Sequence, residues 1–95
     1  MDRTLNRYRF TEAVPMQEAE DSLMLAVLAA EGIYGRSRVR LETSFALDAG
    51  KRACVIDAST EVGQHVSRVF TTFITKQFGE EAFRLERLAN ENLTA

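Results

Sequence analysis

The chain has few residues with the chemistry of a catalytic centre. Cys54 is its single cysteine and His65 its single histidine. Cysteine in an apolar strand usually packs as a small hydrophobe, and His65 follows Glu61 by four residues, the spacing of an exposed ion pair on a helix. Segment 32–35, Gly-Ile-Tyr-Gly, lacks the spacing and the lysine of a phosphate-binding loop. The sequence therefore predicts no catalytic residue, cofactor or metal site, and it favours a non-enzymatic protein.

Arginine is the other residue type with binding chemistry. Ten of the twelve basic residues are arginine, whose planar guanidinium suits phosphate and carboxylate. Five of them alternate with apolar residues and should share the open face of a sheet: Arg7, Arg9, Arg38, Arg40 and Arg84. This face is a candidate nucleic-acid-binding surface. Against it, Glu42 and Glu86 lie among the arginines, a mixture typical of a solvated sheet face, and the net charge is -2.

Alternation of apolar and polar residues predicts three strands, at residues 6–12, 37–48 and 82–88, and a short apolar run after a turn predicts a fourth at 52–58. Pro15 and the acidic residues after it predict a helix over 15–31, which Gly32 and Gly35 end. Ser59 or Thr60 caps a second helix, which continues to Phe78. The chain thus reads strand, helix, strand, strand, helix, strand.

The loop between the second and third strands leaves their register open. A two-residue loop places Cys54 and Ile56 beside Phe45, whereas a three-residue loop places Ala53 and Val55 there. The side of the sheet on which Cys54 lies follows from this choice, so both alternatives stay open.

The order of elements predicts an α+β ferredoxin-like βαββαβ sandwich. Right-handed crossovers put both helices on one face of a four-stranded antiparallel sheet, with strand order 4-1-3-2. The length of 95 residues suits one domain, here 1–88, with a polar C-terminal tail at 89–95. The RNA recognition motif has the same order but stacks bases on aromatic residues of its third strand, and the third strand here has none.

The first helix contains an unbroken apolar octet, residues 23–30. Its natural core stripe is Met16, Ala19, Leu23, Ala26, Val27, Ala30 and Tyr34. Met24, Leu25 and Leu28 point away from that stripe, at about 100° of rotation per residue. They are predicted to contact either the second helix or a partner.

The second helix has a similar surplus beside its core stripe of Val62, Val66, Val69, Phe70 and Phe73. Small or apolar residues form another stripe that would let a second backbone approach: Gly63, Ser67, Thr71, Ile74 and Phe78. This stripe is predicted to join Met24, Leu25 and Leu28 in a partner-binding surface. Packing against the first helix of the same molecule is the alternative.

The leading hypothesis is a non-enzymatic protein–protein interaction module, either a homo-oligomer or a small subunit of a larger assembly. Nucleic-acid binding through the arginines is the alternative, and a small-molecule-sensing or catalytic dimer is the weaker one. The octet is shorter than the roughly 20 apolar residues that span a bilayer, so no membrane segment is expected. A cytoplasmic location is the expectation, because a lone cysteine forms no internal disulfide.

Overall fold

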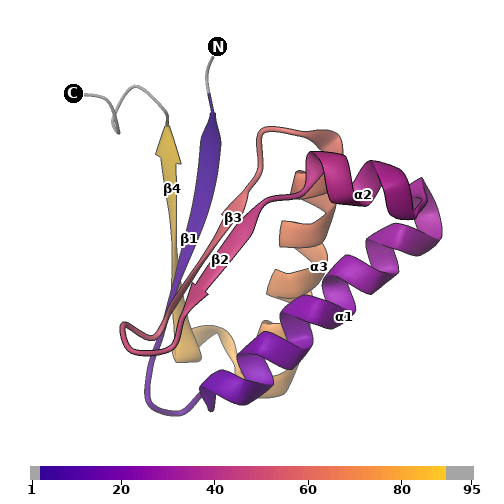
Figure 1. Ribbon diagram of the computed structural model, residues 1–95. Helices are drawn as coiled ribbons and strands as arrows, with labels where there is room; N and C mark the ends of the chain where they lie inside the picture. The colour runs from indigo at the N-terminus through magenta and orange to yellow at the C-terminus, as the bar shows by residue number, and fades with distance from the viewer. Residues whose placement is uncertain (1–2, 90–95) are drawn as a thin grey trace.

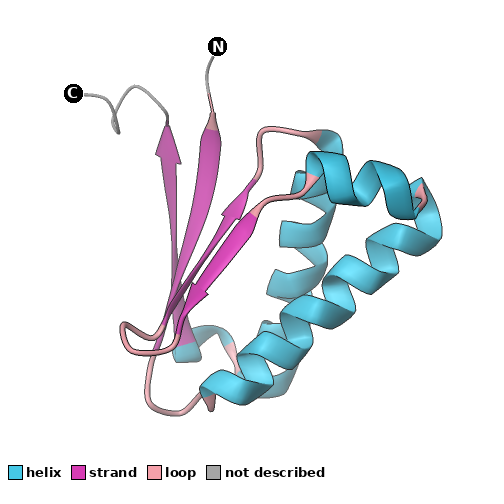
Figure 2. Ribbon diagram, in the orientation of Figure 1, coloured by secondary structure: helices cyan, strands magenta, loops and turns pink. Residues whose placement is uncertain are grey.

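The computed structural model describes residues 3–89 and has an α+β fold with a four-stranded antiparallel sheet. Its elements are β1 (Thr4–Phe10), α1 (Met16–Tyr34), α2 (Arg36–Glu42), β2 (Phe45–Asp48), β3 (Ala53–Asp57), α3 (Glu61–Phe78), the 3-10 helix η1 (Glu80–Ala82) and β4 (Phe83–Ala89). Helices α1 and α3 lie on one side of the sheet (Figures 1 and 2), whose other face has no helix over it in the described chain. The α+β class and the four-stranded antiparallel sheet are thereby confirmed.

The strands lie in the order β2-β3-β1-β4, so β1 is central; counted from the other edge, the order reads β4-β1-β3-β2. Tyr8 of β1 lies opposite Cys54 of β3 and Leu85 of β4. Residues opposite each other on antiparallel strands point to the same side. Alternate residues therefore line a helix-facing side, and those between them, such as Arg7, line the open side.

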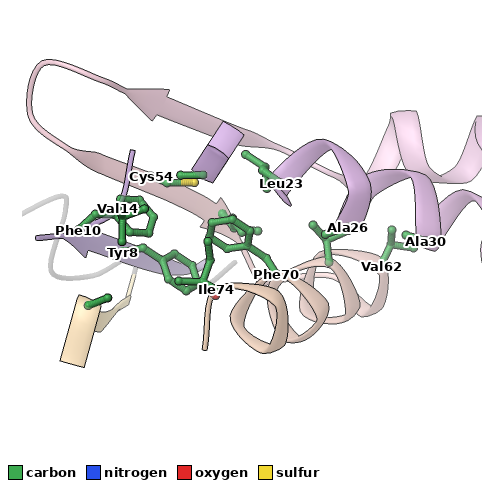
Figure 3. Packing of buried hydrophobic residues seen from close by; sticks show 14 of the residues in the cluster. Tyr8, Phe10, Val14, Leu23, Ala26, Ala30, Cys54, Val62, Phe70 and Ile74 are labelled. Carbon is green, nitrogen blue, oxygen red and sulfur yellow. The ribbon is translucent and has the colours of Figure 1, made fainter. Parts of the chain in front are cut away.

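The core lies between the sheet and the two long helices (Figure 3). At its centre the Tyr8 ring meets the Phe70 ring edge-on, with 5.0 Å between the centroids. Helix α1 contributes mainly small side chains from its predicted stripe, including Ala26 and Ala30. Such small residues let helices approach closely, and the core stripe predicted for α1 is confirmed.

Helix α1 is longer than the sequence predicts. Pro15 precedes its first turn, as expected, but Gly32 lies within the helix, which ends at Tyr34 before Gly35 at φ 88°. A glycine inside a helix costs only about 1 kcal/mol, and Tyr34 packs against the core at the helix end. The prediction that the helix ends at residue 31 is therefore wrong by one turn.

A third helix, α2, replaces the first half of the predicted strand 37–48. Only β2, Phe45–Asp48, is a strand. In α2 Val39 is 1% exposed and Leu41 is 86% exposed, whereas a strand would place both on one face. The helix is supported by Arg38, whose Nε donates to Glu42 Oε2 at 2.9 Å, one turn later.

The β2–β3 hairpin settles the side on which Cys54 lies. Leu47 pairs with Cys54 and Phe45 with Ile56, both on the helix-facing side. The loop between the paired residues Asp48 and Ala53 has four residues. A four-residue loop and a two-residue loop both place Cys54 and Ile56 on the same side of the sheet as Phe45. The first alternative is therefore correct about the side, although the loop is two residues longer.

Helix α3 begins and ends as predicted. Thr60 Oγ1 accepts a hydrogen bond from the Gly63 N–H at 2.9 Å, and Gly79, at φ 89°, follows the last residue Phe78. Strand β1 begins two residues before the predicted strand and ends at Phe10. Ala89 belongs to β4, and the remainder of the predicted tail lies outside the described residues.

Candidate functional site

The second half of α1 carries an exposed apolar surface. Met24, Leu25 and Leu28 are 46%, 56% and 62% exposed. The core beneath them is filled by other residues of the same helix, among them Leu23 and Ala26. The three side chains therefore lie on the outer side of α1, as the sequence predicts, and none belongs to the buried core.

Three further residues extend this surface: Ala29, Gly32 and Ile33 are also exposed, Ile33 by 62%. We call the full set the α1 apolar surface: Met24, Leu25, Leu28, Ala29, Gly32 and Ile33. Every exposed residue between positions 24 and 33 belongs to it, whereas the first half of α1 exposes mostly polar and acidic residues. The added residues were not predicted from the sequence, although Leu25, Ala29 and Ile33 have the four-residue spacing of one helix row.

A hollow adjoins this surface between α1 and α3. It has a volume of about 460 Å³ and is lined in part by Leu25, Phe73 and Gln77. At its edge Ser22 Oγ donates to Gln77 Oε1 at 3.1 Å, which joins the two helices. Leu25 thus borders a concave region, while Leu28 stands on the open side of the helix.

The small-residue stripe of α3, Gly63, Ser67, Thr71, Ile74 and Phe78, faces the interior. Gly63, Ser67 and Ile74 are buried, and Thr71 and Phe78 are half-buried. A Cβ on Gly63 would lie 2.1 Å from the Asp57 carbonyl oxygen. The stripe lies against the molecule's own sheet, so the prediction that it forms an exposed partner surface with α1 is wrong.

Polar groups of β1 explain why this stripe turns inward. The Tyr8 hydroxyl forms hydrogen bonds with Ser67 Oγ and, at 2.8 Å, with Thr71 Oγ1. Asn6 Nδ2 donates to Ser67 Oγ at 2.8 Å. Burial raises the pKa of the Tyr8 hydroxyl, and the hydrogen bonds with Ser67 and Thr71 offset part of that shift.

The five candidate arginines do not share one face. Arg7, Arg9 and Arg84 lie on the open side of the sheet, where Arg9 is opposite Arg84. Arg38 and Arg40 lie on α2 instead, because the predicted strand there is a helix. Glu86 Oε1 lies 2.9 Å from Arg7 Nε and 3.4 Å from Arg9 Nε, so a carboxylate partly neutralises the remaining cluster.

Cys54 and His65 occupy separate environments. Cys54 is buried in β3, and burial raises the pKa of its thiol to about 12, which disfavours the nucleophilic thiolate. The His65 ring packs edge-on against Tyr34, with 5.6 Å between ring centroids. Glu61, expected to pair with His65, accepts instead from Arg38 Nη2 at 3.0 Å.

Residues 3–89 contain neither a metal-binding cluster nor a membrane-spanning helix. No group of three or more His, Cys, Asp or Glu residues in that range is placed to hold a metal ion. Nor does any helix of the same range combine the length and apolar character needed to cross a membrane. Comparisons with models of known protein families and with curated protein sequences each gave no match.

Proposed function

We propose that the chain is a non-enzymatic protein–protein interaction module that forms a homodimer through the α1 apolar surface. The observation that carries the proposal is the uninterrupted apolar character of the exposed residues from Met24 to Ile33. We also infer a ferredoxin-like architecture, in which β1-α1-β2-β3-α3-β4 is the basic unit and α2 is an addition before β2. The placement of α1 and α3 on one face of the sheet supports this inference.

Burial of this surface would be favourable. Complete burial of a leucine side chain contributes about 1.5–3 kcal/mol, and Leu25 and Leu28 are each more than half exposed. Contiguous exposed apolar residues with a polar border are typical of interaction sites. Here the border includes Glu20 and Asp21 in the first half of the helix.

The shape of the surface favours a second copy of the same helix. Met24, Leu28 and Gly32 form one row at four-residue spacing, and Leu25, Ala29 and Ile33 form the next. Such rows interlock when two helices pack. Gly32 and Ala29 allow close approach of the backbones, and a two-fold axis brings the same patch of each copy together.

Charge along the helix supports an antiparallel arrangement. The first half of α1 exposes Glu18, Glu20 and Asp21, while Arg36 and Arg40 are exposed on α2, just beyond the other end. These two arginines form no ion pair with any residue in the described part of the chain. When two copies of α1 pack antiparallel about Leu28, the acidic end of each lies near the basic end of the other.

Light scattering coupled to size-exclusion chromatography tests the proposal. The full chain at about 100 μM should have the mass of a dimer, since transient interfaces commonly bind in the micromolar range. Leu25→Asp should give a monomer, because it places a carboxylate within the apolar contact. Thermal unfolding of the dissociated variant, followed by circular dichroism, should still show a cooperative transition.

Leu41→Asp is the matched control, because Leu41 is 86% exposed on α2 and lies outside the α1 apolar surface. This variant should remain dimeric. A wild-type chain that is monomeric at that concentration would contradict the homodimer, and so would a Leu25→Asp variant with unchanged mass. Equal loss of the dimer in both variants would show that the contact lies elsewhere.

A further inference from the structure

A second cavity lies on the other flank of α3, away from α1. It has a volume of about 460 Å³ and opens between α3 and the strands β1 and β4. Its floor includes Asn6, Ser67 and Thr71, and its walls include Leu85, Arg68 and Arg87. The volume lies in the range of small-molecule sites, and eight of the ten lining residues are polar, so the cavity suits a polar ligand.

An incompletely bonded amide lies at the floor of this cavity. Asn6 is 5% exposed, and its Nδ2 donates to Ser67 Oγ. Its Oδ1 is buried and has no hydrogen-bond partner among the described residues. Rotating the amide by 180° exchanges the two atoms, but one end still faces Ser67 and the other still lacks a partner. A buried polar group left in this state costs about 1–3 kcal/mol, so the site favours an occupant with a hydrogen-bonding group.

The charges around the cavity have one sign. Arg68 and Arg87 are the only ionisable side chains among its described lining residues, although the whole chain has a net charge of -2. Neither guanidinium forms an ion pair within residues 3–89. Arg87 lies directly opposite Asn6 in the pairing of β4 with β1, so cation and amide belong to the same side of the sheet.

We propose that this cavity binds a small organic anion that also carries an uncharged polar group. The carboxylate or phosphate of the ligand pairs with Arg68 and Arg87, since guanidinium groups bind both anions through paired hydrogen bonds. Its hydroxyl or amide group hydrogen-bonds to the free end of the Asn6 side chain, which is enclosed in the unliganded protein and turns toward the cavity when the ligand binds. Leu85 packs against the carbon atoms of the ligand. The site is separate from the proposed dimer surface, so either proposal can fail without the other.

Nuclear magnetic resonance titration of the 15N-labelled full chain tests the proposal with two probes. Glycerol 3-phosphate supplies a phosphate and 3-hydroxybutyrate a carboxylate, and each also carries a hydroxyl group. At least one should give saturable shifts at the backbone amides of Asn6, Ser67 and Leu85, with a Kd below about 1 mM. Neutral glycerol, the control, should give none. The probe that binds more tightly identifies the anion the site prefers.

Three variants test whether the anion binds in this cavity. Arg68→Gln combined with Arg87→Gln should weaken binding at least tenfold. Arg40→Gln combined with Arg84→Gln removes the same charge from a helix and the same edge strand outside the cavity, and should leave binding unchanged. Asn6→Asp, which keeps the side-chain shape, should abolish binding of either anion because a carboxylate then faces it.

Three results would overturn the proposal. One is the absence of saturable shifts with both anions up to about 10 mM. The second is binding that persists in the Arg68→Gln, Arg87→Gln variant, and the third is the same set of shifts with glycerol. If Asn6→Asp fails to fold, the two double arginine variants still test the site. Their substituted side chains are exposed, so both variants should fold.

Discussion

Small and apolar residues recur at four-residue spacing on both long helices, and the two sets lie in opposite environments. In the α3 stripe, Gly63 is packed so closely that an added Cβ would meet the Asp57 carbonyl oxygen at 2.1 Å. In the α1 apolar surface, a Cβ on Gly32 would have no heavy atom within 4 Å. Similar residue types at similar spacing thus line a buried contact on one helix and an open surface on the other.

The difference lies in what each helix meets. Ser67 and Thr71 of α3 have hydroxyl groups that match the Tyr8 hydroxyl on the adjacent strand. No such complement faces Leu28 or Ile33 among the described residues, which leaves both 62% exposed. The partner of a helix stripe is therefore set by the groups on the opposing element as much as by the stripe itself.

Gly63→Ala is the change with the largest expected effect. The new methyl group would collide with backbone at Asp57 and press against the capping Thr60 Oγ1, 3.0 Å away. Backbone cannot move aside as a flexible side chain can, so we expect a loss of about 3 kcal/mol in the free energy of unfolding, the upper end of the usual cost of overpacking. Chemical denaturation followed by circular dichroism measures this loss. An unchanged denaturation midpoint would mean that the α3 stripe is not packed against the sheet.

Local signals account for the parts of the fold that could be predicted. Helix α3 follows its capping Thr60 and ends before Gly79 as expected, because both signals act within a few residues. Tyr8 and Phe10 alternate with arginines, and this period correctly separated the buried and open sides of β1. The exposed position of Leu25 followed from helix geometry once the core stripe was known.

The parts of the fold that were predicted wrongly depend on contacts between side chains of different elements. Val39 and Leu41 alternate as in a strand, but Arg38 reaches both Glu42 and Glu61 only when the segment is helical. The inward direction of Ser67 depends on Asn6, 61 residues away in the chain. A contact at that separation leaves no mark in local periodicity, so the buried α3 stripe was missed. Helix α2 was missed because Val39 and Leu41 alternate as in a strand.

Alkaline pH should lower the free energy of unfolding through two buried groups, Cys54 and Tyr8. The α1 apolar surface contains no group that titrates. Burial raises the pKa of Cys54 to about 12 and also raises that of Tyr8. The folded state therefore keeps protons that the unfolded state releases above about pH 9, and stability falls as pH rises. Cys54 alone contributes a loss of at most about 1.4 kcal/mol per pH unit between 9 and 12. Denaturation midpoints at pH 8, 9 and 10 measure the slope.

Cys54→Ala provides the comparison for this pH series, because it removes the thiol from the same buried position. The variant should be less stable at pH 8 and should have a shallower decline up to pH 10. A slope identical to that of the wild type would show that Cys54 does not contribute. A rise in stability with pH would contradict the raised pKa values of both groups.

Gly32→Ala should have the smallest effect, with the opposite sign to that of Gly63→Ala. Gly32 lies inside α1 with open space around it, so alanine lowers the entropy of the unfolded chain without a clash. We expect a gain of about 0.5–1 kcal/mol in the free energy of unfolding. The free energy of unfolding should be measured with and without Gly32→Ala in the Leu25→Asp variant. That variant should be monomeric, so dimer formation cannot mask the gain. A loss of stability there would mean that Gly32 packs against another part of the same molecule, and that the α1 apolar surface is closed at this end before any partner binds.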